Sequence, residues 1–560
     1  MTKKRLTIII AGLFVVWVTI HLPGILYGTD HVPLHASYLT ADEQSPINGA
    51  LHVLEAKSLF GLRNQPTLYY GPVFAIIALP AVIADFVVRL MTHAVTGAGS
   101  YKDFIIWSWG GILGWARLIA VVASFWSLIG MYRLFRTKTF NPRNHSWLPY
   151  AAAIFLGFST LFFEYADTFR HWPFEICILV WQLYLLVRLA EDPHDERCRR
   201  RAGIRWSISA LLTIAIFGIG YLGIMYQIMW LPLMIRWLKA KNWLRLKQFA
   251  QYVLAVVMGC ALMIWWHPYG FIRTLGLAGI VAPQTSLGAV QSVNIVNGTA
   301  HSFWFYLQII FIDNPLMIIL GLVLAFILIR AKKLPSHYVI WTLAITAAAN
   351  YLVFSIPAHH ESRYMLPTVV FMTIGVLLLY SWWCGDEAAR IRTDRRLQMA
   401  VKILFIISFI LSLVQIIGWD RMLAAGPDER RLIIPQILAW QRENRAAKIL
   451  VQKNWPLGYV HTHDAYVNFV TTYNKGNSDL WAYILSLQPP KNITPINVYY
   501  RYLDQPITQA DMKAYDHVVV NVPAAIDPNI WSGSPRDQFD YRPWTVWNYA
   551  AYQDTYDILK

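Results

Sequence analysis

The sequence predicts a polytopic α-helical membrane protein of about eleven spans, with an extracytoplasmic α/β domain at its C-terminal end. The 560 residues are 56% hydrophobic and only 14% charged, and their mean hydropathy is +0.39. Soluble globular proteins rarely combine these values. Apolar runs of roughly 18 to 22 residues recur along the chain, each long enough to cross a hydrocarbon core of about 30 Å.

Basic residues separate these runs and set the predicted orientation. The formal net charge of +16 would suit nucleic acid only if the cations shared one solvated surface. They instead form short clusters between the apolar runs, at 133–143, 188–205, 236–247, 330–333 and 390–402. By the positive-inside rule these loops and the N-terminus are cytoplasmic, and no nucleic-acid partner is expected.

The first predicted span, 6–27, follows Lys3, Lys4 and Arg5 and is too long for a removable signal peptide. The acidic residues that follow are then external, whereas 133–143 is cytoplasmic, so an odd number of crossings lies between them. We expect 110–132 to span and 71–92 to be a juxtamembrane or re-entrant element in a long external loop, 28–110. The alternative is two spans plus a short crossing near Phe104.

From there the apolar runs alternate regularly. Further spans are expected at 147–165, 172–190, 204–220, 221–238, 248–267, 314–331, 337–356, 365–384 and 399–420. An odd number of spans leaves the C-terminus outside. The chain therefore divides into a transmembrane domain, 1–420, and an external domain, 421–560.

The tail has lower hydrophobicity and short runs of mixed type. A helix-like segment, TQADMKAYD (508–516), precedes a strand-like one, HVVVNVP (517–523). Residues 434–452 have helical spacing of apolar residues. We expect a small periplasmic α/β domain.

Three clusters of acids and bases lie in predicted external loops. The first is the pair Asp42 and Glu43, followed by an amphipathic helix suited to the membrane interface. The second lies in FFEYADTFRHWPFE and contains Glu164, Asp167, Arg170, His171 and Glu175. The third lies in PAHHESRYMLP and contains His359, His360, Glu361 and Arg363.

Charges this close to the hydrocarbon boundary are costly and mark functional sites. Arg117 lies inside a predicted span and needs an anionic partner. Carboxylates can act as general bases, and arginines or histidines can stabilise a phosphate leaving group. Each cluster also has a structural interpretation, since acids in loops are often merely solvated and arginines at span ends snorkel to head groups. Adjacent histidines have no set ligand spacing, so the sequence leaves a metal requirement open.

Three motifs resemble those of the C-type (GT-C) glycosyltransferases, in the branch of protein O-mannosyltransferases and aminoarabinose transferases. ADEQSPINGALHVLEAKSLFG (41–61) looks like that family's first external loop. YYGPVFAIIALP (69–80) followed by GWARLIAVVASF (114–125) looks like its aromatic-proline segment and the start of its second span. HHESRYMLP (359–367) is similar to a signature found before a late span.

The resemblance implies inverting transfer of a sugar from a polyprenyl-phosphate donor to a lipid, glycan or protein acceptor on the external face of a bacterial inner membrane. Asp42 would be the general base, with Glu43 as helper or rival, and Asp167 an acid that orients the acceptor or a metal. Arg117, Arg363, His360 and Arg170 would bind the donor phosphate. Candidates for contacting the acceptor or supporting these residues are His359, Glu361, Lys57 and Tyr70.

The motifs depart from the aminoarabinose branch at one place. Gln44, Ser45 and Pro46 stand where that branch has an Arg-Tyr-Ala-like run, so the resemblance implies neither its donor nor lipid A. Two other functions stay open. A transporter or lipid flippase would place its charges near the bilayer midplane and show repeated halves, and a ligase using a diphosphate-linked glycan would differ mainly in its donor.

Overall fold

The structure is a computed structural model, and it describes most of the membrane part and portions of the tail. The described residues are 3–26, 41–64, 70–101, 110–191, 196–277, 306–307, 310, 315–330, 338–355, 362–385, 395–425, 440, 443–444, 447–452, 498–501, 508–522 and 555–558.

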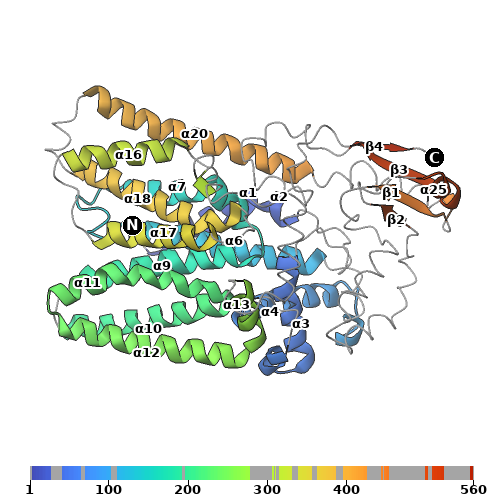
Figure 1. Cartoon of the computed structure of the whole chain (residues 1–560), viewed down its shortest axis with the longest axis horizontal. Helices are drawn as coiled ribbons and strands as arrows, with labels where there is room; N and C mark the ends of the chain where they lie inside the picture. The colour runs from blue at the N-terminus through green and yellow to red at the C-terminus, as the bar shows by residue number, and fades with distance from the viewer. Residues whose placement is uncertain are drawn as a thin grey trace.

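Helices make up the whole of the described membrane part (Figure 1). In chain order they are α1 (Lys3–Ile20), α2 (Leu22–Leu26), α3 (Ala41–Ala56), the 3-10 helix η1 (Leu59–Asn64), α4 (Pro72–Met91), α6 (Gly110–Leu134), α7 (Leu148–Gly157), α8 (Thr160–Ala166), α9 (His171–Glu191), α10 (Glu196–Ile219), the 3-10 helix η2 (Tyr221–Trp230), α11 (Leu231–Lys239), α12 (Trp243–Trp266), α13 (Pro268–Leu277), α16 (Pro315–Arg330), α17 (Tyr338–Ser355), the 3-10 helix η3 (Ser362–Met365), α18 (Leu366–Gly385) and α20 (Arg395–Ala425).

Eight of the described helices are long and apolar enough to cross a membrane, and the bent pair of α7 and α8 would make nine. All of the eight except α4 coincide with predicted spans. The first predicted span and the one at 314–331 correspond to shorter apolar helices, Ile8–Ile20 and Leu316–Arg330. The prediction of a polytopic α-helical membrane protein is confirmed.

Two predicted spans are not straight helices. The span predicted at 147–165 bends by 67° between α7 and α8, because Ser159 takes an extended conformation with ψ at 124°. The span predicted at 221–238 begins with the ten-residue 3-10 helix η2 and becomes α-helical at α11. Pro232 occupies the first turn of α11, where its missing N–H costs no helical hydrogen bond. Apolar composition alone does not reveal such breaks.

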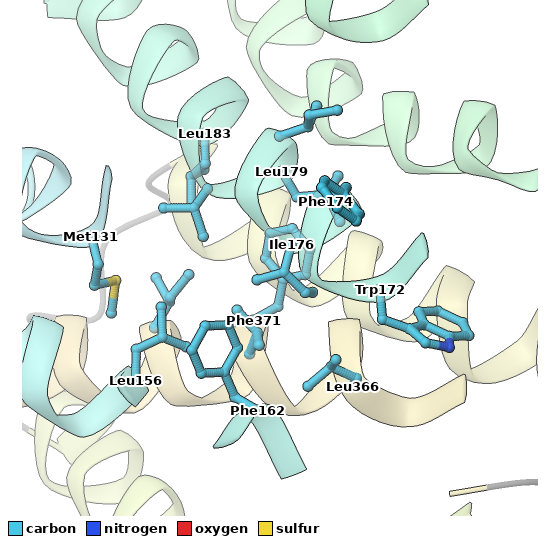
Figure 2. Packing of buried hydrophobic residues seen from close by; sticks show 14 of the residues in the cluster. Met131, Leu156, Phe162, Trp172, Phe174, Ile176, Leu179, Leu183, Leu366 and Phe371 are labelled. Atoms are coloured by element: carbon cyan, nitrogen blue, oxygen red, sulfur yellow. The ribbon is translucent and has the colours of Figure 1, made fainter. Parts of the chain in front are cut away.

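Helix α9 lies at the centre of the bundle. Ile176 and Leu183 on α9 are fully buried and pack among residues of α6, α7, α8 and α18, including Phe162 and Leu366 (Figure 2). In lipid, close packing of this kind, rather than exclusion of water, holds helices together. This packing therefore holds the start of α9 in place and fixes the positions of the polar residues around it.

One end of the bundle, which we call the α3 end, collects the starts of α6 and α9 and the end of α10. Phe169, just before α9, donates its N–H to Glu43 of α3, and the N–H of Gly71 bonds to the carbonyl of Ile219 at the end of α10 (3.0 Å). Figure 1 shows α2 and α3 on the side of the bundle that faces the sheet of the tail.

Helix α4 meets the length and composition criteria for a span, but its contacts place both of its ends at the α3 end. Its start is tied to α10 through Gly71. Near its other end, Asp85 lies against Gly111 in the first turn of α6 and accepts a hydrogen bond from Tyr101 (3.0 Å). Burial and the Asp85 carboxylate raise the pKa of Tyr101, so its hydroxyl stays protonated. These contacts favour the juxtamembrane element that the sequence predicted at 71–92.

The described part of the tail forms a four-stranded sheet with strand order β2-β1-β3-β4. The strands are β1 (Ile449–Gln452), β2 (Val498–Arg501), β3 (His517–Val522) and β4 (Thr555–Ile558), and the helix α25 (Gln509–Ala514) precedes β3. The first three strands are parallel and β4 is antiparallel to β3. The predicted helix and strand at 508–523 are confirmed, whereas the helix predicted at 434–452 is wrong over β1.

Candidate active site

The acidic pair lies within a helix rather than in a loop. Helix α3 begins at Ala41, six residues before the amphipathic segment that the sequence suggested. Asp42 and Glu43 therefore occupy its first turn, where unpaired N–H groups and the helix dipole favour negative charge. The register of α3 buries Glu43, which is only 3% exposed.

Glu43 forms a two-pronged ion pair with Arg117 of α6. The Nε of Arg117 donates to Oε1 of Glu43 (3.1 Å) and Nη2 donates to Oε2 (3.2 Å). Oε1 also accepts the N–H of Phe169 (2.8 Å). Arg117 is fully buried, so this carboxylate compensates a charge that water cannot reach. The pair joins α3, α6 and the segment that leads into α9.

Gly24 of α2 connects this ion pair to Asp167. Its carbonyl accepts a hydrogen bond from Nη1 of Arg117 (3.0 Å). On its other side, the Asp167 carboxylate lies against the Cα of Gly24, where a Cβ would collide with it. Only glycine allows α2 to pass between Arg117 and Asp167 at this distance.

Asp167 ends α8 and pairs with His21, at the turn between α1 and α2. The Nδ1 of His21 lies 3.3 Å from Oδ2 of Asp167, and both side chains are fully buried. The imidazole stacks on Phe163, with ring centroids 4.2 Å apart, and meets Trp17 edge to face. The sequence analysis missed His21. A histidine at the end of the first span was the available signal, because ionisable groups in spans are usually functional.

Other predicted residues surround this core at the α3 end. Arg170 is 5% exposed and lies between Phe169, which bonds to Glu43, and His171, which starts α9. Tyr70 is half-buried, with its ring 5.0 Å from the ring of His171. Lys57 is exposed just after α3. The structure therefore brings together residues of the first and second predicted clusters.

The third cluster is described only in part. Arg363 lies in η3, immediately before α18. Asn350 of α17 holds this turn by donating to the carbonyl of Tyr364 (2.8 Å) and to Oγ1 of Thr368 (2.9 Å). His359, His360 and Glu361 lie outside the described residues.

The described residues contain no group of three or more histidines, cysteines, aspartates or glutamates placed to hold a metal ion. The chemistry that these residues do offer is that of carboxylates and guanidinium groups. Those groups can accept a proton or bind an anion.

The chain matches no known family by sequence and no curated protein. It is similar to two solved structures of ArnT from Cupriavidus metallidurans, one bound to undecaprenyl phosphate and one in the apo state. In each case the identity is 13%, the TM-score is 0.42, and the match covers 91% of this chain and 93% of that chain. At these values the likeness assigns neither activity nor ligand. Its own helices define this protein as an integral membrane protein with a buried cluster of acids and bases at one end of its bundle.

Proposed function

We propose that this protein is an inverting glycosyltransferase of the GT-C type, which moves a sugar from a polyprenyl-phosphate donor to an acceptor on the external face of the membrane. The observation that carries the proposal is the Glu43–Arg117 ion pair, because it docks the first turn of α3 onto the start of α6 and the entry to α9. Asp42 is the neighbouring residue in that turn, with its Cα about 3.8 Å from that of Glu43.

In this reaction the carboxylate of Asp42 takes the proton of the acceptor hydroxyl. The acceptor oxygen then bonds to the anomeric carbon of the sugar, and the bond between that carbon and the phosphate oxygen breaks. The electron pair leaves with the polyprenyl phosphate, whose charge a cation must balance. Holding the base and the donor in one geometry supplies much of the rate enhancement.

We assign the phosphate to Arg170 and Arg363, together with His360. The phosphate contact of Arg117 remains an untested prediction. We do not assign the phosphate to it, because its Nε, Nη1 and Nη2 donate to Glu43 and Gly24. In our proposal Arg117 positions α3 through Glu43. Asp167, held by His21, orients the acceptor. His359, Glu361, Lys57 and Tyr70 are the remaining candidates for acceptor contact.

The distribution of charge supports an enzyme over a transporter. Among the residues that the structure describes, the buried ion pairs of Glu43 and Asp167 lie at the α3 end. The pair of Arg188 and Glu191 lies at the opposite end of α9. A transporter would need such charges near the midplane. The proposed location is a bacterial inner membrane, with the N-terminus cytoplasmic and the tail periplasmic.

A transfer assay tests this function. Purified protein in lipid nanodiscs is offered radiolabelled polyprenyl-monophosphate sugars with candidate acceptors, and free polyprenyl phosphate is measured. The proposal predicts its release by the wild-type protein with at least one donor. Release only from diphosphate-linked donors would support the ligase alternative, and no release from either class would refute a glycosyltransferase.

A further inference from the structure

Glu175, in the second turn of α9, is a buried carboxyl group that the proposed mechanism does not use. It is 3% exposed, and no described residue forms a hydrogen bond or ion pair with it. Its Oε1 packs against the backbone of Gly220, where an added Cβ would lie 2.8 Å away. A buried carboxyl with no hydrogen-bond partner among the described residues is costly in a membrane protein, so a ligand that donates hydrogen bonds to it would stabilise this site.

The ring of His171 lies near the carboxyl, and further aromatic rings follow from it. His171, one helical turn earlier on α9, lies on the same side of Gly220, with its Cδ2 3.9 Å from the position of that added Cβ. The ring of Tyr70 lies 5.0 Å from the ring of His171. Trp172 continues the row toward Tyr364 of η3, with ring centroids 5.8 Å apart. A carboxylate accepts hydrogen bonds from hydroxyl groups, and aromatic faces cover apolar C–H surface. A sugar ring presents both.

The backbone beside Glu175 is also unusual. Tyr221 begins the ten-residue 3-10 helix η2 directly after Gly220, and 3-10 runs longer than three or four residues are uncommon. A Cβ on Gly71 would collide with the backbone of Gly218. Glycines at this junction let the start of α4 approach α10 closely, and the next glycine along the chain, Gly220, is the one that Glu175 contacts.

We propose that Glu175, His171 and Tyr70 form a subsite for the sugar of the lipid-linked donor, in which the Glu175 carboxyl accepts hydrogen bonds from ring hydroxyls. The inference rests on the proposed function. The donor is favoured as the source of the sugar because the two arginines assigned to its phosphate adjoin this row of rings: Arg170 precedes His171, and Arg363 precedes Tyr364.

Binding measurements on the full-length protein in nanodiscs test the subsite. The probes are undecaprenyl phosphate and a panel of undecaprenyl-phosphate hexoses and pentoses, and the variants are Glu175→Ala and Glu175→Gln. Losing a buried hydrogen bond predicts that Glu175→Ala weakens binding of the preferred sugar lipid by about fivefold or more. Binding of bare undecaprenyl phosphate should change less than about twofold. Glu175→Gln keeps an acceptor oxygen and should lose less.

Glu191→Gln, at the opposite end of the same helix, is the matched control and should change neither affinity. Equal weakening of both lipids by Glu175→Ala, or no weakening of either, would overturn the subsite. It would also be overturned if wild-type protein bound every sugar lipid no more tightly than undecaprenyl phosphate. If Glu175→Ala does not fold, the same comparison is made with Glu175→Leu, which also removes both carboxyl oxygens but keeps most of the side-chain volume. Failure of wild-type protein to bind any of these lipids would instead contradict the proposed function itself.

Discussion

Removing either partner of the ion pair between Glu43 and Arg117 should destabilise the protein far more than removing both. Arg117 is fully buried and Glu43 is 3% exposed, so Glu43→Met leaves a guanidinium group without its counter-charge and Arg117→Met leaves a carboxylate without one. Breaking a buried pair in this way costs about 3–5 kcal/mol, whereas replacing both partners by apolar residues is often close to neutral. We therefore expect the double variant to lie within about 2 kcal/mol of wild type.

The free energy of unfolding can be measured for all four proteins by SDS titration in mixed micelles. Glu55→Met is the matched control, because Glu55 lies on the same helix, is 46% exposed and is 4.0 Å from its partner His52. That change should cost less than about 1 kcal/mol. The reasoning is refuted if each single variant costs no more than the control, or if the cost of the double variant equals the sum of the two single costs.

Two further substitutions test neighbouring contacts by the same titration. Gly24→Ala should lower the free energy of unfolding by about 1–3 kcal/mol, because the new Cβ would collide with the Asp167 carboxylate. The control is Gly12→Ala, which should be neutral or slightly stabilising because a Cβ at Gly12 would have nothing within 4 Å. Equal costs for the two variants would contradict this account. Asn350→Ala should also lower the free energy of unfolding by about 1–3 kcal/mol, because it leaves the carbonyl of Tyr364 without its 2.8 Å hydrogen bond. An unchanged unfolding midpoint would show that this bond does not hold η3 in place.

The apolar runs predicted most of the membrane part correctly, since length and hydrophobicity suffice to identify a span. They could not predict the bend after Gly157 or the 3-10 helix η2. Both breaks occur in segments as apolar as a straight span, and packing against neighbouring helices decides their shape. The prediction at 508–523 succeeded because a capped polar helix followed by a short run of β-branched residues is a local pattern.

In the candidate site too, the sequence indicated which residues are unusual but not which of them contact one another. The sequence singled out Asp42, Glu43, Arg117 and Asp167 as unusual charges near span ends, and the structure brings Glu43, Arg117 and Asp167 together. The sequence could not show that Glu43 pairs with Arg117, because that pairing depends on where α3 begins and on a contact 74 residues apart in the chain. His21 was missed for a similar reason, since its partner lies 146 residues away.

The most direct test of the account compares Asp42→Asn with Glu55→Gln in the transfer assay, with both proteins purified in nanodiscs. Asn is nearly isosteric with Asp but cannot accept the acceptor's proton, and Glu55 is an exposed acid on the same helix. The account predicts that Asp42→Asn folds normally but loses at least about 100-fold in turnover, while Glu55→Gln stays near wild type. Near wild-type release of polyprenyl phosphate by a folded Asp42→Asn protein would contradict the assignment of Asp42 as the base.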